Sequence, residues 1–151
     1  MSGADSRAPV AGIEDVIHYA GSSKCDNGKV DGLGLLARPS DNGEASVNRL
    51  KGLADNDTDA VAVIRSLCRL AIRPNGLWAQ FNVGVAINRL QSMADIKDAR
   101  CLSAPLPPEA TYPADPTHAV ICPLPHDDGS EFADLVGDIL KNAVTAHYPG
   151  R

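Results

Sequence analysis

The end of the chain carries the strongest structural signal in the sequence, the pattern of an amphipathic helix. Apolar residues recur there at intervals of three and four, as on the buried face of an α-helix, and they are Phe132, Leu135, Val136, Ile139, Leu140, Ala143 and Val144. Asp128 and Glu131 have the spacing of a capping box, and Pro149 with Gly150 ends the expected helix. Because an apolar helix face must be covered, we expect this helix to lie against a β-sheet and to complete one core.

Further helices are expected in the first two thirds of the chain. Residues 55–59 offer several N-cap side chains, and the apolar residues after them repeat at helical spacing up to Pro74, which the helix cannot include. Residues 84–93 fit either a short helix or the extension of a strand, and we favour the helix. A short helix is also expected at residues 13–19, where apolar positions fall three and four residues apart.

Strands are expected where short apolar runs lie between turn residues. In residues 77–83 apolar and polar side chains alternate, which predicts a strand with one buried face. Four further runs have the length and composition of strands: residues 33–38, 45–50, 99–103 and 118–122. The Asn42-Gly43 pair predicts a hairpin between the first two, and Pro123 and Pro125 predict an edge position or an abrupt exit for the last. Residues 104–116, which hold five of the eleven prolines, are expected to form a long surface loop.

The whole pattern predicts a single α+β domain, a small and mostly antiparallel sheet packed by two main helices that include the C-terminal one. A chain of 151 residues with 44% hydrophobic residues can bury one core. Residues 1–11 are small and polar, so we expect a flexible tail ahead of a domain at residues 12–151. An Arg-Pro pair precedes an Asn-Arg-Leu triplet twice, at unequal spacing, which leaves open whether part of the chain is duplicated.

Charge and composition disfavour some classes of binding partner. The net charge of −5 and the pI near 5.2 disfavour nucleic acids and anionic lipids, and the apolar runs are far shorter than a membrane span. The N-terminus lacks the apolar region of a secretory signal, so we expect a cytoplasmic protein with reduced cysteines. The partner-binding candidates are four arginines and the single tryptophan, Arg38, Arg49, Arg73, Arg89 and Trp78, because arginine suits recognition of an acidic protein surface.

Catalytic candidates are few. Cys25 follows Lys24, whose charge can activate a thiol, and His118 shares a predicted strand with Cys122. The spacing of these residues with His126 matches no standard zinc pattern, so we expect no metal. The sequence holds no phosphate-binding or dinucleotide-binding glycine motif, so we expect no cofactor.

Two short stretches carry a resemblance to known proteins. They are Ser46-Val47-Asn48-Arg49 and the combination of Pro105-Leu106-Pro107 with Pro116-Thr117-His118-Ala119-Val120. In both, the chain resembles small bacterial proteins of unassigned function. The resemblance implies a bacterial or phage origin and supplies no catalytic residues.

The sequence therefore favours a non-enzymatic protein that binds another protein, such as an accessory subunit or an immunity or defence component. The proline-rich loop motivates this hypothesis, because a preorganised loop can present a surface to a partner. The alternative is a small hydrolase or transferase that uses Cys25 or the region of His118 and Cys122.

Overall fold

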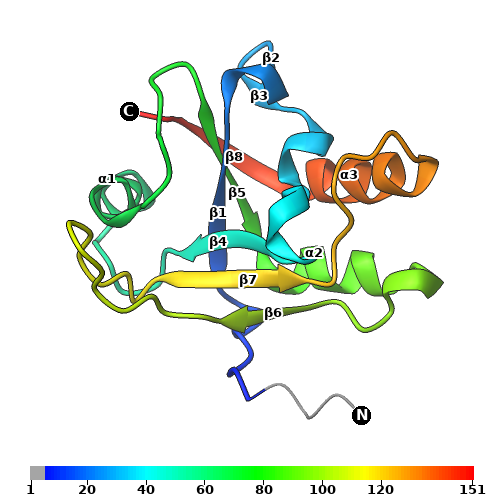
Figure 1. Cartoon of the computed structure of the whole chain (residues 1–151), viewed down its shortest axis with the longest axis horizontal. Helices are drawn as coiled ribbons and strands as arrows, with labels where there is room; N and C mark the ends of the chain where they lie inside the picture. Colours follow the sequence, from blue (N-terminus) through cyan, green and yellow to red (C-terminus); the bar gives the residue numbers. More distant parts are fainter. Residues whose placement is uncertain (1–5) are drawn as a thin grey trace.

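The computed structural model describes residues 6–151, and a six-stranded sheet lies at its centre (Figure 1). In spatial order its strands are β6 (Arg100–Ser103), β7 (His118–Cys122), β4 (Ala45–Arg49), β1 (Asp15–Ala20), β5 (Leu77–Asn82) and β8 (Val144–Pro149). Every neighbouring pair is antiparallel. A separate hairpin joins β2 (Cys25–Asp26) to β3 (Lys29–Val30).

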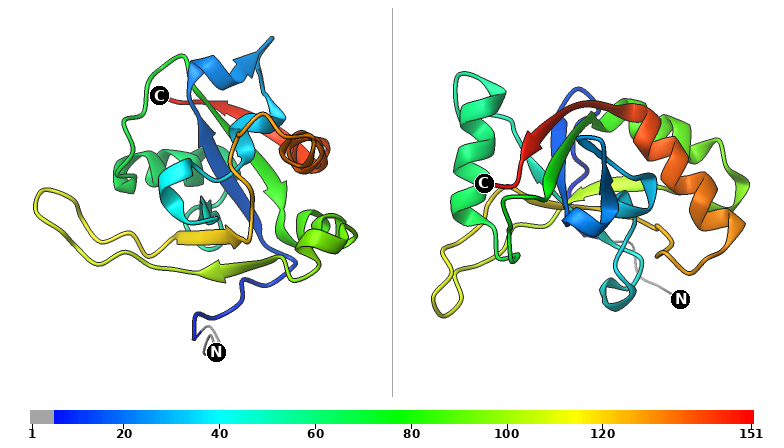
Figure 2. Two further views of the ribbon diagram at one scale, coloured as in Figure 1. Left: turned by 45° about the vertical axis from the view of Figure 1, so that its right-hand side comes forward. Right: turned by 90° about the horizontal axis from the view of Figure 1, so that it is seen from above.

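Helices cover both faces of this sheet (Figure 2). Helix α1 (Asp57–Leu67) lies on one face, and α2 (Val83–Gln91) and α3 (Glu131–Ala143) lie on the other. Four short 3-10 helices complete the fold: η1 (Ser22–Lys24), η2 (Gly32–Leu35), η3 (Pro39–Asp41) and η4 (Ala94–Ile96). The predicted α+β class, with a small antiparallel sheet, is confirmed.

The C-terminal helix forms as the apolar stripe predicts. Val136 and Leu140 are fully buried in the larger of two main cores, which fills the space between the sheet and helices α2 and α3. Ser130 caps the helix, because its Oγ accepts from the N–H of Ala133 at 3.1 Å, while Asp128 accepts from the N–H of Ser130. The apolar stripe therefore does close a core against the sheet.

The same helix ends earlier than the sequence predicts. It stops at Ala143, and the next six residues form β8, the strand that pairs with β5 at the edge of the sheet. The expected extension through Val144 toward Pro149 is wrong, because this segment satisfies its backbone by pairing with β5. No local signal separates that outcome from one more helical turn.

Residues 15–20 form β1, and the short helix expected at residues 13–19 is wrong. This strand lies between β4 and β5, so both of its edges are paired, and a core covers each of its faces. Val16 packs in the larger core and Ile17 packs against α1 on the opposite face, and both are fully buried. Apolar residues on both faces of a central strand mimic the spacing of a helix, which explains the error.

Three other expectations about strands are corrected. The run at 33–38 contains η2 and no sheet strand, so the predicted hairpin is absent and β4 pairs with β1 and β7. Strand β7 lies between β6 and β4 and is not an edge strand, so of the two alternatives only the abrupt exit fits, since the strand ends at Cys122 directly before Pro123. Strand β5 is buried on both faces, since Trp78 lies under α1 and Gln80 is 4% exposed.

Two segments outside these elements lie next to the sheet, residues 8–10 and residues 104–116. Ala8 accepts from the N–H of Ser103, and Val10 donates to the carbonyl of Cys101, so residues 8–10 run along β6. The proline-rich residues 104–116 form an irregular arm that extends beyond β6 and β7 (Figure 1), with bridges from Leu106 to Asp115 and from Glu109 to Tyr112. The arm lies outside the sheet, as expected for a loop.

Candidate functional site

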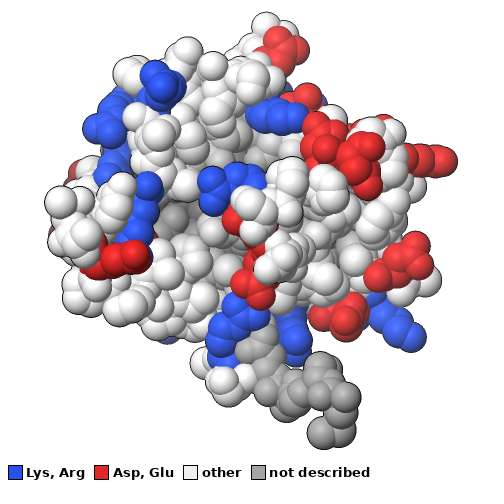
Figure 3. Space-filling view, in the orientation of Figure 1, with Lys and Arg blue, Asp and Glu red and all other residues white. Residues whose placement is uncertain are grey.

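A cleft opens where two neighbouring strands of the sheet separate. Strands β1 and β4 pair at Val16–Arg49 and Ile17–Asn48 and then diverge. Two adjoining cavities of about 530 and 140 Å³ lie beside this opening, and they share Tyr19, Arg38, Ser46 and Leu70 as lining residues. Figure 3 shows a hollow near the middle of one face of the molecule, bordered by basic side chains.

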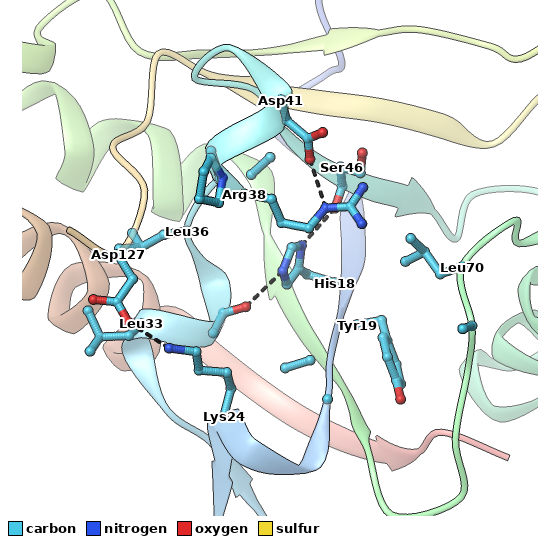
Figure 4. A pocket seen from close by; sticks show the side chains of 17 residues that line it. His18, Tyr19, Lys24, Leu33, Leu36, Arg38, Asp41, Ser46, Leu70 and Asp127 are labelled. Atoms are coloured by element: carbon cyan, nitrogen blue, oxygen red, sulfur yellow. Dashed lines mark hydrogen bonds and ion pairs between the residues drawn. The ribbon is translucent and has the colours of Figure 1, made fainter.

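His18 holds the diverging strands together. Its Nδ1 lies 2.7 Å from the carbonyl oxygen of Ser46 on β4, and its Nε2 lies 2.9 Å from that of Gly34 in η2 (Figure 4). Burial lowers the pKa of His18, an effect that outweighs the two carbonyl groups that favour its charged form. The neutral ring therefore donates to one carbonyl, and its other nitrogen faces the second.

Three polar side chains of the smaller cavity come from paired strands. Ser46 and Asn48 are alternate residues of β4, so their side chains project from the same face of the sheet. Asn48 stands directly opposite His118 of β7, which brings the His118 ring to that face as well. All three line the smaller cavity.

A buried carboxylate supports this group. Asp115 is 2% exposed, and its oxygens accept from Asn48 Nδ2 at 3.0 Å, Thr117 Oγ1 at 2.7 Å and the Thr117 N–H at 3.0 Å. Asn48 Nδ2 also donates to Thr117 Oγ1 at 2.8 Å. Because each buried polar group has a partner, this network fixes the position of Asn48 and of the base of the arm.

His118 contacts Ser46 in a defined tautomer. Its Nδ1 lies 2.7 Å from the carbonyl oxygen of Ala104, and its Nε2 lies 3.1 Å from Ser46 Oγ. A carbonyl oxygen can only accept, so the neutral ring carries its proton on Nδ1. Nε2 then presents its lone pair to the serine hydroxyl, which donates to it.

Lys24 and Arg38 reach the larger cavity (Figure 4), and Arg69 from a third segment lines the smaller one. Lys24 Nζ lies 2.6 Å from Asp127 and Arg38 Nε lies 2.9 Å from Asp41, and both cations remain partly exposed. Arg69 pairs with Glu109 at 3.3 Å, donates to the carbonyl oxygens of Pro107 and Pro113, and lies 5.7 Å from the centre of the Tyr112 ring.

The Nε atom of Arg69 is buried and has no hydrogen-bond partner among residues 6–151. Arg69 lines the smaller cavity together with Ser46 and His118. A buried donor without a partner is costly in a folded protein.

Neither Cys25 nor Cys122, the sequence-predicted cysteines, lines this cleft. Cys25 lies in the β2–β3 hairpin, where its thiol contacts the carbonyl oxygens of Ala20 and Gly21. Cys122 ends β7 in a small apolar cluster with Leu102 and Val120. Burial raises the pKa of both thiols, so neither has the activated character of a nucleophile. Figure 1 shows β2 and β7 on different parts of the molecule, so Cys25 does not meet His118.

Of the sequence-predicted partner-binding residues, Arg38 lines the cleft. Arg49 forms two hydrogen bonds, at 2.9 and 2.7 Å, with the buried carboxylate of Glu14. Trp78 is fully buried and donates to the carbonyl oxygen of Gly150 at 3.4 Å. Arg73 lies in the exposed turn before β5, and Arg89 on α2 donates to the carbonyl oxygen of Asn142. The structure therefore does not gather these residues on one surface.

Several cleft residues escaped the sequence-based prediction, among them His18, Lys24, Arg69, Asn48 and Asp115. A usable signal existed for Ser46 and Asn48, which alternate on a predicted strand inside one of the stretches that carry the resemblance. The resemblance includes both Ser46-Val47-Asn48-Arg49 and the stretch around Thr117 and His118, and these stretches lie on the paired strands β4 and β7. For the others, only the tertiary fold brings them together, since Lys24, Arg69 and Asp115 lie outside the strands of the sheet.

Comparisons with known proteins assign this chain to no family. Neither the profiles of protein families, nor curated proteins, nor solved structures gave a match to the chain. Within residues 6–151 no group of three or more His, Cys, Asp or Glu side chains is placed to hold a metal ion. None of the helices described is long and apolar enough to span a bilayer.

Proposed function

We propose that the protein binds another protein and that the cleft receives an acidic, extended segment of that partner. The observation that carries the proposal is the placement of Lys24, Arg38 and Arg69 along one continuous cleft, on three different segments of the chain. Tyr19 and Leu70, which line both cavities, add apolar surface between these charges. Alternating apolar and acidic side chains on an extended peptide would match this lining.

The acids that now pair with these cations do not prevent such binding. Arg38 is 61% exposed in its side chain, and Lys24 is 39% exposed. Ion pairs in contact with solvent contribute little to stability, because water screens them and the long side chains lose freedom. Carboxylates of a partner can therefore replace Asp41 and Asp127 at small cost, especially where the partner also covers the cleft.

The resemblance and the cysteines bear on the origin of the protein and on the compartment in which it would act. The resemblance to small bacterial proteins supports a bacterial or phage origin, in which the protein would serve as an accessory subunit or an immunity or defence component. All four cysteines carry free thiols, which supports a reducing compartment such as the cytoplasm.

Binding can be tested with a fluorescein-labelled ten-residue peptide that alternates leucine with glutamate, compared with the same peptide carrying glutamine. We expect fluorescence anisotropy to show binding of the glutamate peptide that weakens with added salt. An Arg38→Glu variant should bind at least about tenfold more weakly, since it replaces attraction by repulsion. Arg89→Glu, which changes an exposed arginine on α2, is the matched control and should bind normally.

Two results would contradict the proposal. One is equal affinity for the glutamate and glutamine peptides, which would remove the role of charge. The other is equal weakening in the cleft variant and in Arg89→Glu, which would show that net charge, and not the cleft, governs binding.

A further inference from the structure

We propose that Ser46 and His118 form a nucleophile and base that hydrolyse small carboxylic esters in the smaller cavity. This inference goes beyond partner binding and does not depend on it. It differs from the Cys-based alternative drawn from the sequence, because the nucleophile is a serine on β4. It rests on three observations made within one cavity.

The first observation is the geometry of the pair. Ser46 Oγ and His118 Nε2 lie 3.1 Å apart, within the range found between a serine nucleophile and its base. The Ala104 carbonyl oxygen, 2.7 Å from Nδ1, fixes the ring in the tautomer whose Nε2 can accept a proton. In this arrangement the carbonyl takes the orienting role that a carboxylate has in other serine hydrolases.

The second observation is access. Ser46 and His118 are each half-buried, and Ser46 lines both cavities. A substrate can therefore reach the hydroxyl from the larger cavity and place its acyl group in the smaller one. The smaller cavity of about 140 Å³ holds only a few heavy atoms, which limits the acyl group to one the size of acetate or butyrate.

The third observation is positive charge at the same place. Attack on a carbonyl creates an oxyanion, which needs hydrogen-bond donors or cations that are already in position. Arg69 lines the smaller cavity and Arg38 lines both cavities. Their guanidinium groups bring positive charge to the cavity in which the oxyanion would form.

The reaction balances without a further reagent. Ser46 Oγ forms a bond to the carbonyl carbon while its proton passes to His118 Nε2. The bond from that carbon to the leaving alkoxide breaks, and the alkoxide takes the proton from His118 and departs as an alcohol. Water then attacks the acyl-serine, gives one proton to His118, and releases the carboxylic acid as that proton returns to Ser46.

The test uses the unaltered protein with p-nitrophenyl acetate and p-nitrophenyl butyrate as substrates. We expect hydrolysis that Ser46→Ala and His118→Gln each reduce by about a hundredfold or more, the usual contribution of such groups. His126→Ala removes an exposed imidazole and controls for unspecific hydrolysis by histidine, and it should retain the full rate. Ser40→Ala removes an exposed hydroxyl and should also retain it.

A fluorophosphonate probe gives an independent readout that needs no variant. Mass spectrometry of the labelled, unaltered protein should locate the adduct on Ser46. Labelling elsewhere only, or a Ser46→Ala rate equal to that of the unaltered protein, would overturn the proposal. Ser46→Ala should still bind the glutamate peptide, so failure of catalysis and failure of partner binding are separate results.

Discussion

Two glycines bring α3 against η2, and this contact positions one wall of the cleft. A Cβ added to Gly32 would lie 2.5 Å from the carbonyl oxygen of Gly137, and a Cβ on Gly137 would lie 2.9 Å from the carbonyl carbon of Gly32. Leu33 and Gly34 of the same short helix line the larger cavity. The Gly32→Ala substitution therefore probes the packing that supports the site.

The expected magnitude follows from two opposing effects. Replacing glycine by alanine stabilises a protein by about 0.4–1 kcal/mol where the backbone allows it, because the unfolded chain loses freedom. Forcing extra atoms into a packed contact costs about 1–3 kcal/mol, and here the neighbouring atoms are backbone that cannot rotate away. We expect Gly32→Ala to lower the free energy of unfolding by about 1–2 kcal/mol, which lowers Tm by roughly 2–8 °C for a chain of this size.

Gly21→Ala is the matched control. Gly21 has φ −67°, and a Cβ there meets no atom within 4 Å, so the control should be slightly stabilised. Urea unfolding can be followed by the fluorescence of Trp78, the single tryptophan, which is buried under α1. Equal stability of the two variants would refute the close approach of α3 to η2.

Three further predictions concern titratable groups. The Arg49 guanidinium holds the pKa of Glu14 below its usual value of 4.5, so the ionised Glu14 stabilises the fold above that pH. Below it, the free energy of unfolding falls as Glu14 takes up a proton. Urea unfolding at several pH values should show that Glu14→Gln removes part of this fall. Burial lowers the pKa of His18 below 6.5, so on acidification His18 takes up a proton in the unfolded chain before it does so in the folded protein. The free energy of unfolding should therefore fall as the pH drops below 6.5, and His18→Gln should reduce this dependence on pH. Burial raises the pKa of Cys101 to about 12 and also raises the pKa of Cys122, so 5,5′-dithiobis(2-nitrobenzoic acid) should label both only after unfolding.

Each of these predictions has a clear contrary result. An unchanged acid midpoint in Glu14→Gln would show that its ion pair does not stabilise the fold. A pH slope that persists in His18→Gln would assign the effect to His147, whose pKa is also lowered by burial. Rapid labelling of the folded protein at Cys101 would show that the strands around it open readily.

Local sequence patterns predicted most of the elements that depend on local interactions. The stripe of α3, the cap residues ahead of α1 and the alternation in β5 each report contacts between residues close in the chain. In α1 and α3 the buried face is visible in the spacing of apolar residues, because the other side is polar. In β5 the alternation is visible because the second face carries the polar residue Gln80, although that face is buried as well. Strand β1 carries Val16 and Ile17 on opposite faces, so its apolar residues do not alternate with polar ones.

Tertiary structure decided where the proposed Ser46–His118 site lies. Ser46 and His118 are 72 residues apart, and only the register that places Asn48 opposite His118 brings them into contact. The cleft itself arises because β1 and β4 diverge after two pairs, a property of the sheet that no single segment encodes. The sequence by itself determined that the segments of α1 and α3 are helical and which runs are apolar, because helix caps and side-chain periodicity are local. Strand order, register and the site built on them came from long-range backbone pairing, for which many partners are locally equivalent.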